Sequence, residues 1–213
     1  MDLLTTLVSL VILVYSAILH EIAHGYAAER LGDPTARLMG RLTLNPKNHI
    51  DPIMSIFLPL VLILSGSPVV FGAAKPVPVD PFNLKDGRKD IALVSLAGPA
   101  TNFLLAVLAA LLLKLLGNLL LPMQSGVLVL WFLLTVVKIN LLLGIFNLIP
   151  IPPLDGSKIF ALILPEREAN TYLSLGSIGI FIIFFLLMFP IGGISLGAVM
   201  DNLLAFSEKL LGL

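Results

Sequence analysis

Residues 20–24 read His20-Glu21-Ile22-Ala23-His24, inside an apolar stretch, Leu3–Arg30, that is long enough to form a transmembrane helix. Side chains at positions i and i+4 of a helix lie one turn apart on the same face. Two imidazoles in this arrangement can bind one zinc ion, and the Glu that follows the first His can reach a water molecule on it. Because titratable groups inside a bilayer are costly and usually mark function, the motif predicts a hydrolytic metal site within a membrane.

The composition indicates a polytopic membrane protein. Of the 213 residues, 58% are hydrophobic and only 12% are charged, whereas an ordinary soluble domain is about 25% charged. The formal net charge is zero and no basic run occurs, so nothing predicts a nucleic-acid partner. The absence of Cys excludes disulfides and thiolate zinc sites. We expect a single integral-membrane domain over residues 1–213, whose first apolar segment is a retained helix rather than a signal peptide, because no Lys or Arg precedes it.

The apolar runs predict an all-α polytopic fold with about five to six transmembrane helices and a re-entrant or extended segment near the active site. A weaker run at Ile194–Leu211 follows a Pro-Ile-Gly-Gly turn and either spans the membrane or lies on its surface. The stronger runs are Leu3–Arg30, Ile91–Leu116, Val127–Leu148 and Thr171–Phe189.

The distribution of basic residues predicts the orientation in the membrane. The loops at 30–51 and 75–90 each carry four Lys or Arg residues, whereas the connection at 117–126 carries none. The positive-inside rule therefore places both basic loops in the cytoplasm and the N-terminus outside. Ile53–Phe71, which is interrupted by prolines and glycine, must then enter and leave on the same side; the alternative is that it spans.

Two imidazoles do not complete a catalytic zinc site, which usually has three protein ligands and one position for water. The best candidate for the third ligand is Asp155, because the helix that ends near Leu148 reaches the same side of the membrane as the second half of the first helix. Three prolines between Leu148 and Asp155 break the helix just before Asp155, and Gly156 permits a tight turn after it. The remaining histidine, His49, lies in a polar loop and is expected to be a solvated residue.

Three elements of the sequence together resemble the site-2 protease family of intramembrane zinc metalloproteases. Their order and intervals fit this family over nearly the whole chain, and the length suits the short bacterial or archaeal members without PDZ or CBS domains. The elements are His20-Glu21-Ile-Ala-His24, Gly98-Pro99-Ala-Thr-Asn102 and Asn147-Leu-Ile-Pro150-Ile-Pro152-Pro153-Leu-Asp155-Gly156.

This resemblance implies a zinc endopeptidase in a bacterial or archaeal cell membrane that cleaves transmembrane segments of other proteins, with its active site toward the cytoplasm. It implies one zinc ion, held by His20, His24 and Asp155, and Glu21 as the catalytic carboxylate. Asn147 falls at the family's Asn position, where it either orients substrate or stabilises developing charge. The substrate's identity and the oligomeric state do not follow from the resemblance.

Glu21 is expected to act as the general base that takes a proton from water and passes it to the leaving amine. A substrate helix must unwind before its carbonyl can be attacked. The segment Gly72–Val79, with alternating Pro and Val, is typical of an extended edge that can hold an unwound peptide by strand addition.

Other interpretations stay open from the sequence alone. The protein could be a transporter that uses intramembrane polar residues as an ion path, or a metal-binding scaffold without turnover. We expect a role in helix packing or in bracing the metal site, rather than in direct catalysis, for Gly98, Pro99 and Asn102. Lys138, inside an apolar run, is expected to snorkel or to pair internally, and Asn140 to link helices.

Overall fold

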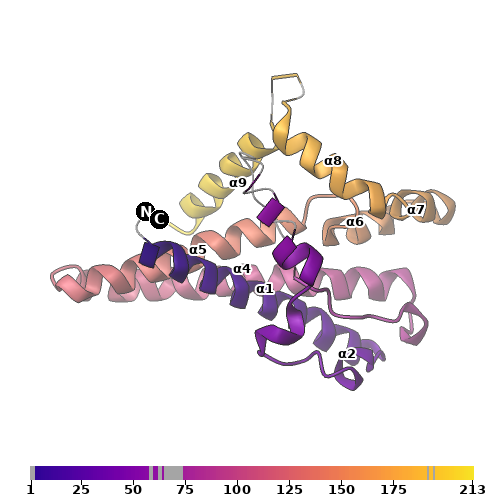
Figure 1. Ribbon diagram of the computed structural model, residues 1–213, viewed down its shortest axis with the longest axis horizontal. Helices are drawn as coiled ribbons and strands as arrows, with labels where there is room; N and C mark the ends of the chain where they lie inside the picture. The colour runs from indigo at the N-terminus through magenta and orange to yellow at the C-terminus, as the bar shows by residue number, and fades with distance from the viewer. Residues whose placement is uncertain (1–2, 58–59, 62–63, 65–73, 191, 194) are drawn as a thin grey trace.

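The computed structural model describes residues 3–57, 60–61, 64, 74–190, 192–193 and 195–213, and within these ranges helices are joined by turns and loops without any β-strand (Figure 1). The predicted all-α polytopic fold is confirmed. The elements are α1 (Leu3–Leu31), α2 (Thr35–Leu38), η1 (Pro46–His49), η2 (Pro52–Phe57), η3 (Pro81–Asn83), α4 (Arg88–Leu120), α5 (Gln124–Asn147), α6 (Asp155–Phe160), η4 (Ala161–Ile163), α7 (Glu166–Leu173), α8 (Gly176–Met188) and α9 (Leu196–Leu210).

Three helices in the described residues, α1, α4 and α5, are long and apolar enough to cross a membrane. They run roughly alongside one another, and each packs against the other two (Figure 1). A fourth span results if α7 and α8 are counted together as one bent segment. The predicted count of five to six transmembrane helices is therefore not confirmed.

The run Thr171–Phe189 was expected to be one helix, and this expectation is wrong. The chain bends by 70° between α7 and α8, and Thr171 lies inside α7. The polar sequence Glu166-Arg167-Glu168 begins α7, so that this helix suits a surface rather than a membrane interior. At its end Leu175 N–H donates to the carbonyl of Tyr172, three residues back, which tightens the last turn and stops the helix.

The last helix, α9, has 15 residues and a length of about 22 Å, which is too short to cross the hydrocarbon core alone. It packs along α5. The Lys138 ammonium on α5 lies 3.7 Å from Glu208 Oε1 on α9. The expected internal pairing of Lys138 is therefore confirmed.

Small side chains allow α4 and α5 to approach closely. Ala106, Ala109 and Ala110 of α4 form a buried cluster with Leu133, Val137 and Leu141 of α5. The antiparallel packing of α1, α4 and α5 brings the second half of α1, the start of α4 and the end of α5 to one end of the bundle, where α6 also packs on α4.

The expected re-entrant segment Ile53–Phe71 lies mostly outside the described residues; its described beginning is part of a short π-helix, η2. Of the expected edge Gly72–Val79, residues 74–79 are described, and they have no regular secondary structure. His49 is buried, with 3% of its surface exposed, and its Nε2 lies 2.8 Å from the Thr43 carbonyl oxygen. The expectation of a solvated His49 is wrong, because the loop folds back over this ring.

Candidate metal centre

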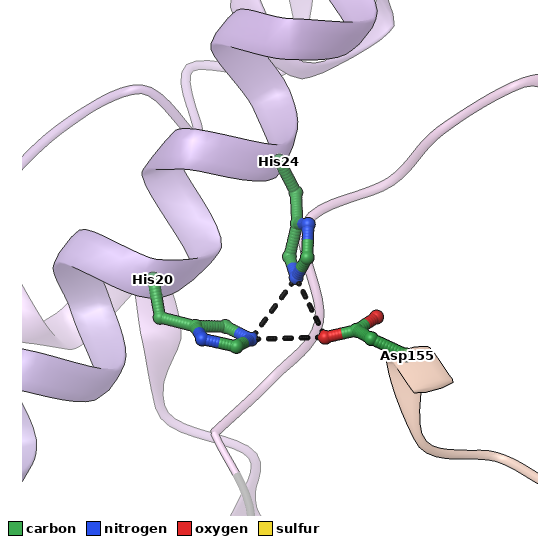
Figure 2. A group of neighbouring side chains, drawn as sticks. All are labelled: His20, His24 and Asp155. Atoms are coloured by element: carbon green, nitrogen blue, oxygen red, sulfur yellow. Dashed lines mark hydrogen bonds and ion pairs between the residues drawn. The ribbon is translucent and has the colours of Figure 1, made fainter. Parts of the chain in front are cut away.

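The two histidines of α1 and Asp155 at the start of α6 meet in the bundle and are all buried. The Nε2 atoms of His20 and His24 lie 3.0 Å apart, and each lies 3.1 Å from Asp155 Oδ2 (Figure 2). In a tetrahedral zinc site with ligand bonds of about 2.0–2.1 Å, neighbouring ligand atoms are about 3.3 Å apart. The three donor atoms therefore fit one zinc ion, and they form the one group of three metal-ligating side chains among the described residues.

The second nitrogen of each imidazole is held by an acceptor from α4. His20 Nδ1 lies 2.6 Å from Asn102 Oδ1, and His24 Nδ1 lies 2.7 Å from the Val94 carbonyl oxygen. Because both partners accept, each Nδ1 carries the proton and each Nε2 lone pair is left for a metal. This pattern is typical of metal-binding histidines.

Asn102 is itself fixed by a chain of buried hydrogen bonds that crosses three helices. Its Nδ2 donates to Asn140 Oδ1 at 2.9 Å, and Asn140 Nδ2 donates to Ser16 Oγ on α1, also at 2.9 Å. Neither amide side chain is exposed to solvent. The contacts agree with the predicted bracing role of Asn102 and the predicted interhelical role of Asn140.

Gly98 has a closer relation to the metal centre than the sequence suggested. A Cβ atom at this position would lie 2.5 Å from the Nε2 atoms of both His20 and His24. Helix α4 can therefore pass the two imidazoles only because residue 98 has no side chain. The His-Glu-x-x-His spacing carries no signal for this requirement.

Asp155 presents its two carboxylate oxygens to different groups. Oδ2 faces the imidazoles, while Oδ1 lies 3.3 Å from the ammonium of Lys158, one turn later in α6. Burial by itself would raise the pKa of this carboxyl, but hydrogen bonding with His20 and His24 and the charge of Lys158 lower the pKa below its ordinary value. The anionic form that binds metals is therefore favoured.

A cavity of about 360 Å³ opens beside the three side chains. All five residues that the sequence predicts for the site line it: His20, Glu21, His24, Asn147 and Asp155. Glu21 Oε2 accepts a hydrogen bond of 2.7 Å from the backbone N–H of Val77. The sequence carried no signal for this contact, because 56 residues separate the two partners.

Asn147 is the last residue of α5 and lines the cavity. Its Nδ2 donates to the Leu143 carbonyl oxygen of its own helix at 2.9 Å. The Asn147 side chain makes no other hydrogen bond within the described part of the chain. The structure therefore brings Asn147 to the site without joining it to the two histidines or to Asp155.

A buried His-His-Asp cluster beside a Glu, with both histidines on a helix that is long and apolar enough to cross a membrane, is typical of a membrane metalloprotease. The model of peptidase family M50 matches residues 8–122 and 121–190, and the chain belongs to this family, the site-2 proteases. It is a zinc metalloprotease and an integral membrane protein.

Several bacterial proteins are similar to the chain. "Putative zinc metalloprotease YwhC" of Bacillus subtilis (strain 168) is 35% identical over 187 residues, which cover 84% of this chain and 80% of that protein. "Putative zinc metalloprotease Rip2" of Mycobacterium tuberculosis (strain ATCC 25618 / H37Rv) is 35% identical over 177 residues, or 81% of this chain and 62% of the relative. No solved structure matches the chain. The family and these names favour a protease over a transporter.

Proposed function

We propose that this metalloprotease hydrolyses peptide bonds in transmembrane segments of other membrane proteins, as a single domain over residues 1–213. The observation that carries the proposal is the place of the His20, His24 and Asp155 cluster within the bundle. His20 lies eleven residues before the end of α1, or about 16 Å along the helix axis. The helix α1 packs against α4 and α5, and all three are long and apolar enough to cross a membrane, which supports a site at the depth of a substrate's membrane segment.

In the proposed mechanism His20, His24 and Asp155 hold one zinc ion. When bound there, zinc supplies Lewis-acid chemistry, lowering the pKa of water and polarising a carbonyl. Glu21 accepts a proton from the attacking water and delivers it to the amide nitrogen as the C–N bond breaks. Oε2 of Glu21 is occupied by the Val77 N–H, so that Oε1 is the oxygen available for this transfer.

The end of α5 supplies a further polar group to the proposed site. The carboxamide of Asn147 lines the same cavity as Glu21. An amide that can both donate and accept suits the orientation of a substrate peptide or the stabilisation of negative charge on its carbonyl oxygen. We propose one of these two roles for Asn147.

The strap, which we define as residues 74–80, is proposed to hold the unwound substrate as an added strand. Val77 and Val79 both line the cavity. Val79 has a backbone N–H and a carbonyl without hydrogen-bond partners in the described part of the chain, unlike the N–H of Val77. An unpaired N–H and C=O on one residue are the groups that bind a neighbouring strand.

The proposed orientation places the metal centre toward the cytoplasm of a bacterial or archaeal cell. The basic loops at 30–51 and 75–90 flank the end of the bundle that carries the site, and the positive-inside rule favours the cytoplasm for them.

Metal analysis and a cleavage assay on the purified protein test these roles together. The substrate is a labelled transmembrane peptide in micelles, and a soluble unstructured peptide serves as comparison. Glu21→Gln should keep one zinc per chain and lose turnover by at least about a hundredfold, because general-base catalysis is worth roughly 10²–10⁴. Asp155→Ala should lose zinc. Undiminished turnover by Glu21→Gln, or cleavage of the soluble peptide alone, would refute the proposal.

A further inference from the structure

Arg41 is a buried cation whose sequence context gives no reason for its burial. Only 7% of its surface is exposed, and in the described part of the chain no carboxylate lies within ion-pair distance of it. Its Nη2 instead donates to two backbone carbonyl oxygens of the strap, that of Lys75 at 2.8 Å and that of Pro76 at 3.3 Å. Burial of a guanidinium without an anion is costly, which indicates that its contact with the strap has a function.

The Pro76 carbonyl and the Val77 N–H belong to one peptide unit. A trans peptide unit is planar, and its C=O and N–H point in opposite directions; the bond between Pro76 and Val77 is trans. Arg41 binds the oxygen end of this plane, and Glu21 Oε2 accepts from its N–H end. A positive charge at the carbonyl also polarises the peptide and strengthens the N–H as a donor.

Other contacts fix the strap on both sides of this peptide unit. Lys75 N–H donates to the His49 carbonyl oxygen at 2.8 Å, and Asp80 N–H donates to Asp33 Oδ2 at 2.7 Å. These two contacts hold the strap at both ends, and the contact with Arg41 sets the rotation of the peptide plane that faces Glu21.

We propose that Arg41 is a positioning residue for the general base: it acts through the Pro76–Val77 peptide unit to hold the Glu21 carboxylate in its catalytic orientation. The proposal rests on the role of Glu21 given above. Catalysis then requires the Arg41 contact, whereas zinc binding does not, since Arg41 contacts neither the histidines nor Asp155.

Hydrogen exchange of the purified, zinc-loaded protein tests the geometry without reference to activity. Because Pro76 and Pro78 have no N–H, residues 76–79 contain two exchangeable amides, one bonded to Glu21 and one free. The wild type should show one slow and one fast amide in this segment. Arg41→Gln and Glu21→Ala should each make the slow amide at least about tenfold faster.

Arg37→Gln is the matched control, because Arg37 lies four residues before Arg41, on α2, but is exposed and pairs with Glu29 instead of the strap. It should leave both exchange rates unchanged. Zinc content should stay at one per chain in Arg41→Gln. A slow Val77 amide that persists in Arg41→Gln would overturn the proposal, whatever the cleavage assay shows.

Cleavage kinetics test whether the contact acts on the chemical step. Arg41→Gln should lower kcat about tenfold, a fraction of the general-base effect, with KM within about twofold. Val77→Pro removes the N–H that binds Glu21 and should lower kcat by a similar factor. The double variant should be no slower than the slower single variant, because both changes break one linkage.

Two further variants keep the outcome clear. If Arg41→Gln folds poorly, Arg41→Lys takes its place. It keeps the positive charge and should retain part of the wild-type kcat. Val79→Pro removes an N–H that does not bind Glu21; it should raise KM if the strap holds substrate. Multiplicative losses in the double variant, or an Arg41→Gln effect on KM alone, would contradict the positioning role, whereas an unchanged KM in Val79→Pro would contradict only strand addition.

Discussion

Gly98 faces His20 so closely that a methyl group on its Cα would lie 2.5 Å from the imidazole Nε2. That distance is well inside van der Waals contact, and the same methyl group would also meet His24 Nε2. Helix α4 therefore forms one wall of the metal centre by its backbone alone.

The first prediction follows from this contact. Gly98→Ala should push both imidazoles from their positions and weaken zinc binding at least about tenfold, as losses of metal-site geometry typically do. Zinc affinity by competition with a chelator is the measurement. Gly117→Ala, in the same helix and with nothing within 4 Å of its added methyl, is the control and should bind zinc as the wild type does. Equal affinity in the two variants would contradict the described wall.

The second prediction concerns Asn102. Asn102→Leu keeps the approximate size but removes the acceptor from His20 Nδ1, so that the ring loses its orientation. Zinc affinity should fall about 10–100-fold, and the thermal midpoint should fall because a buried donor, His20 Nδ1–H, and a buried acceptor, Asn140 Oδ1, lose their partners. Asn140→Leu, one step further from the metal, should cost stability with a smaller loss of zinc affinity. The reverse order of the two zinc affinities would count against the bracing role.

The third prediction concerns pH and Asp33, in the loop after α1. Burial raises the pKa of this carboxyl, but the hydrogen bonds from Thr35, Asn83 and the Asp80 N–H outweigh it and hold the pKa below its ordinary value. A lowered pKa in the folded state gives stability that is present above about pH 4, the unfolded value, and is lost as the pH falls through the folded pKa.

The measurement for Asp33 is the thermal midpoint between pH 7 and pH 3 in micelles. Asp33→Asn should lower the midpoint at pH 7 by about 3–12 °C, from hydrogen bonds to a charged group worth about 1.5–3 kcal/mol. It should also flatten the decline of the midpoint below about pH 4. Glu29→Gln, which removes an exposed pair, serves as control. A midpoint in Asp33→Asn that equals the wild type at pH 7 would show that the strap does not depend on this carboxylate.

Much of the fold could be predicted because its signals are local. The apolar runs place α1, α4 and α5 to within a few residues of their observed ends, since a membrane helix must satisfy its own backbone and expose apolar side chains. The bend between α7 and α8 was missed. Apolar content alone does not register a turn such as the one that Leu175 and Tyr172 close.

The sequence by itself determined that this chain is an apolar helical protein with two imidazoles one turn apart, because helical periodicity needs no information beyond a few neighbouring residues. Tertiary structure alone decided that Asn102 meets His20, that Gly98 passes both rings and that the Val77 N–H meets Glu21. These partners are separated by 56 to 82 positions in the chain. Their contact depends on how far each helix is rotated and shifted against its neighbour, which is set by the packing of whole helix faces rather than by any local pattern.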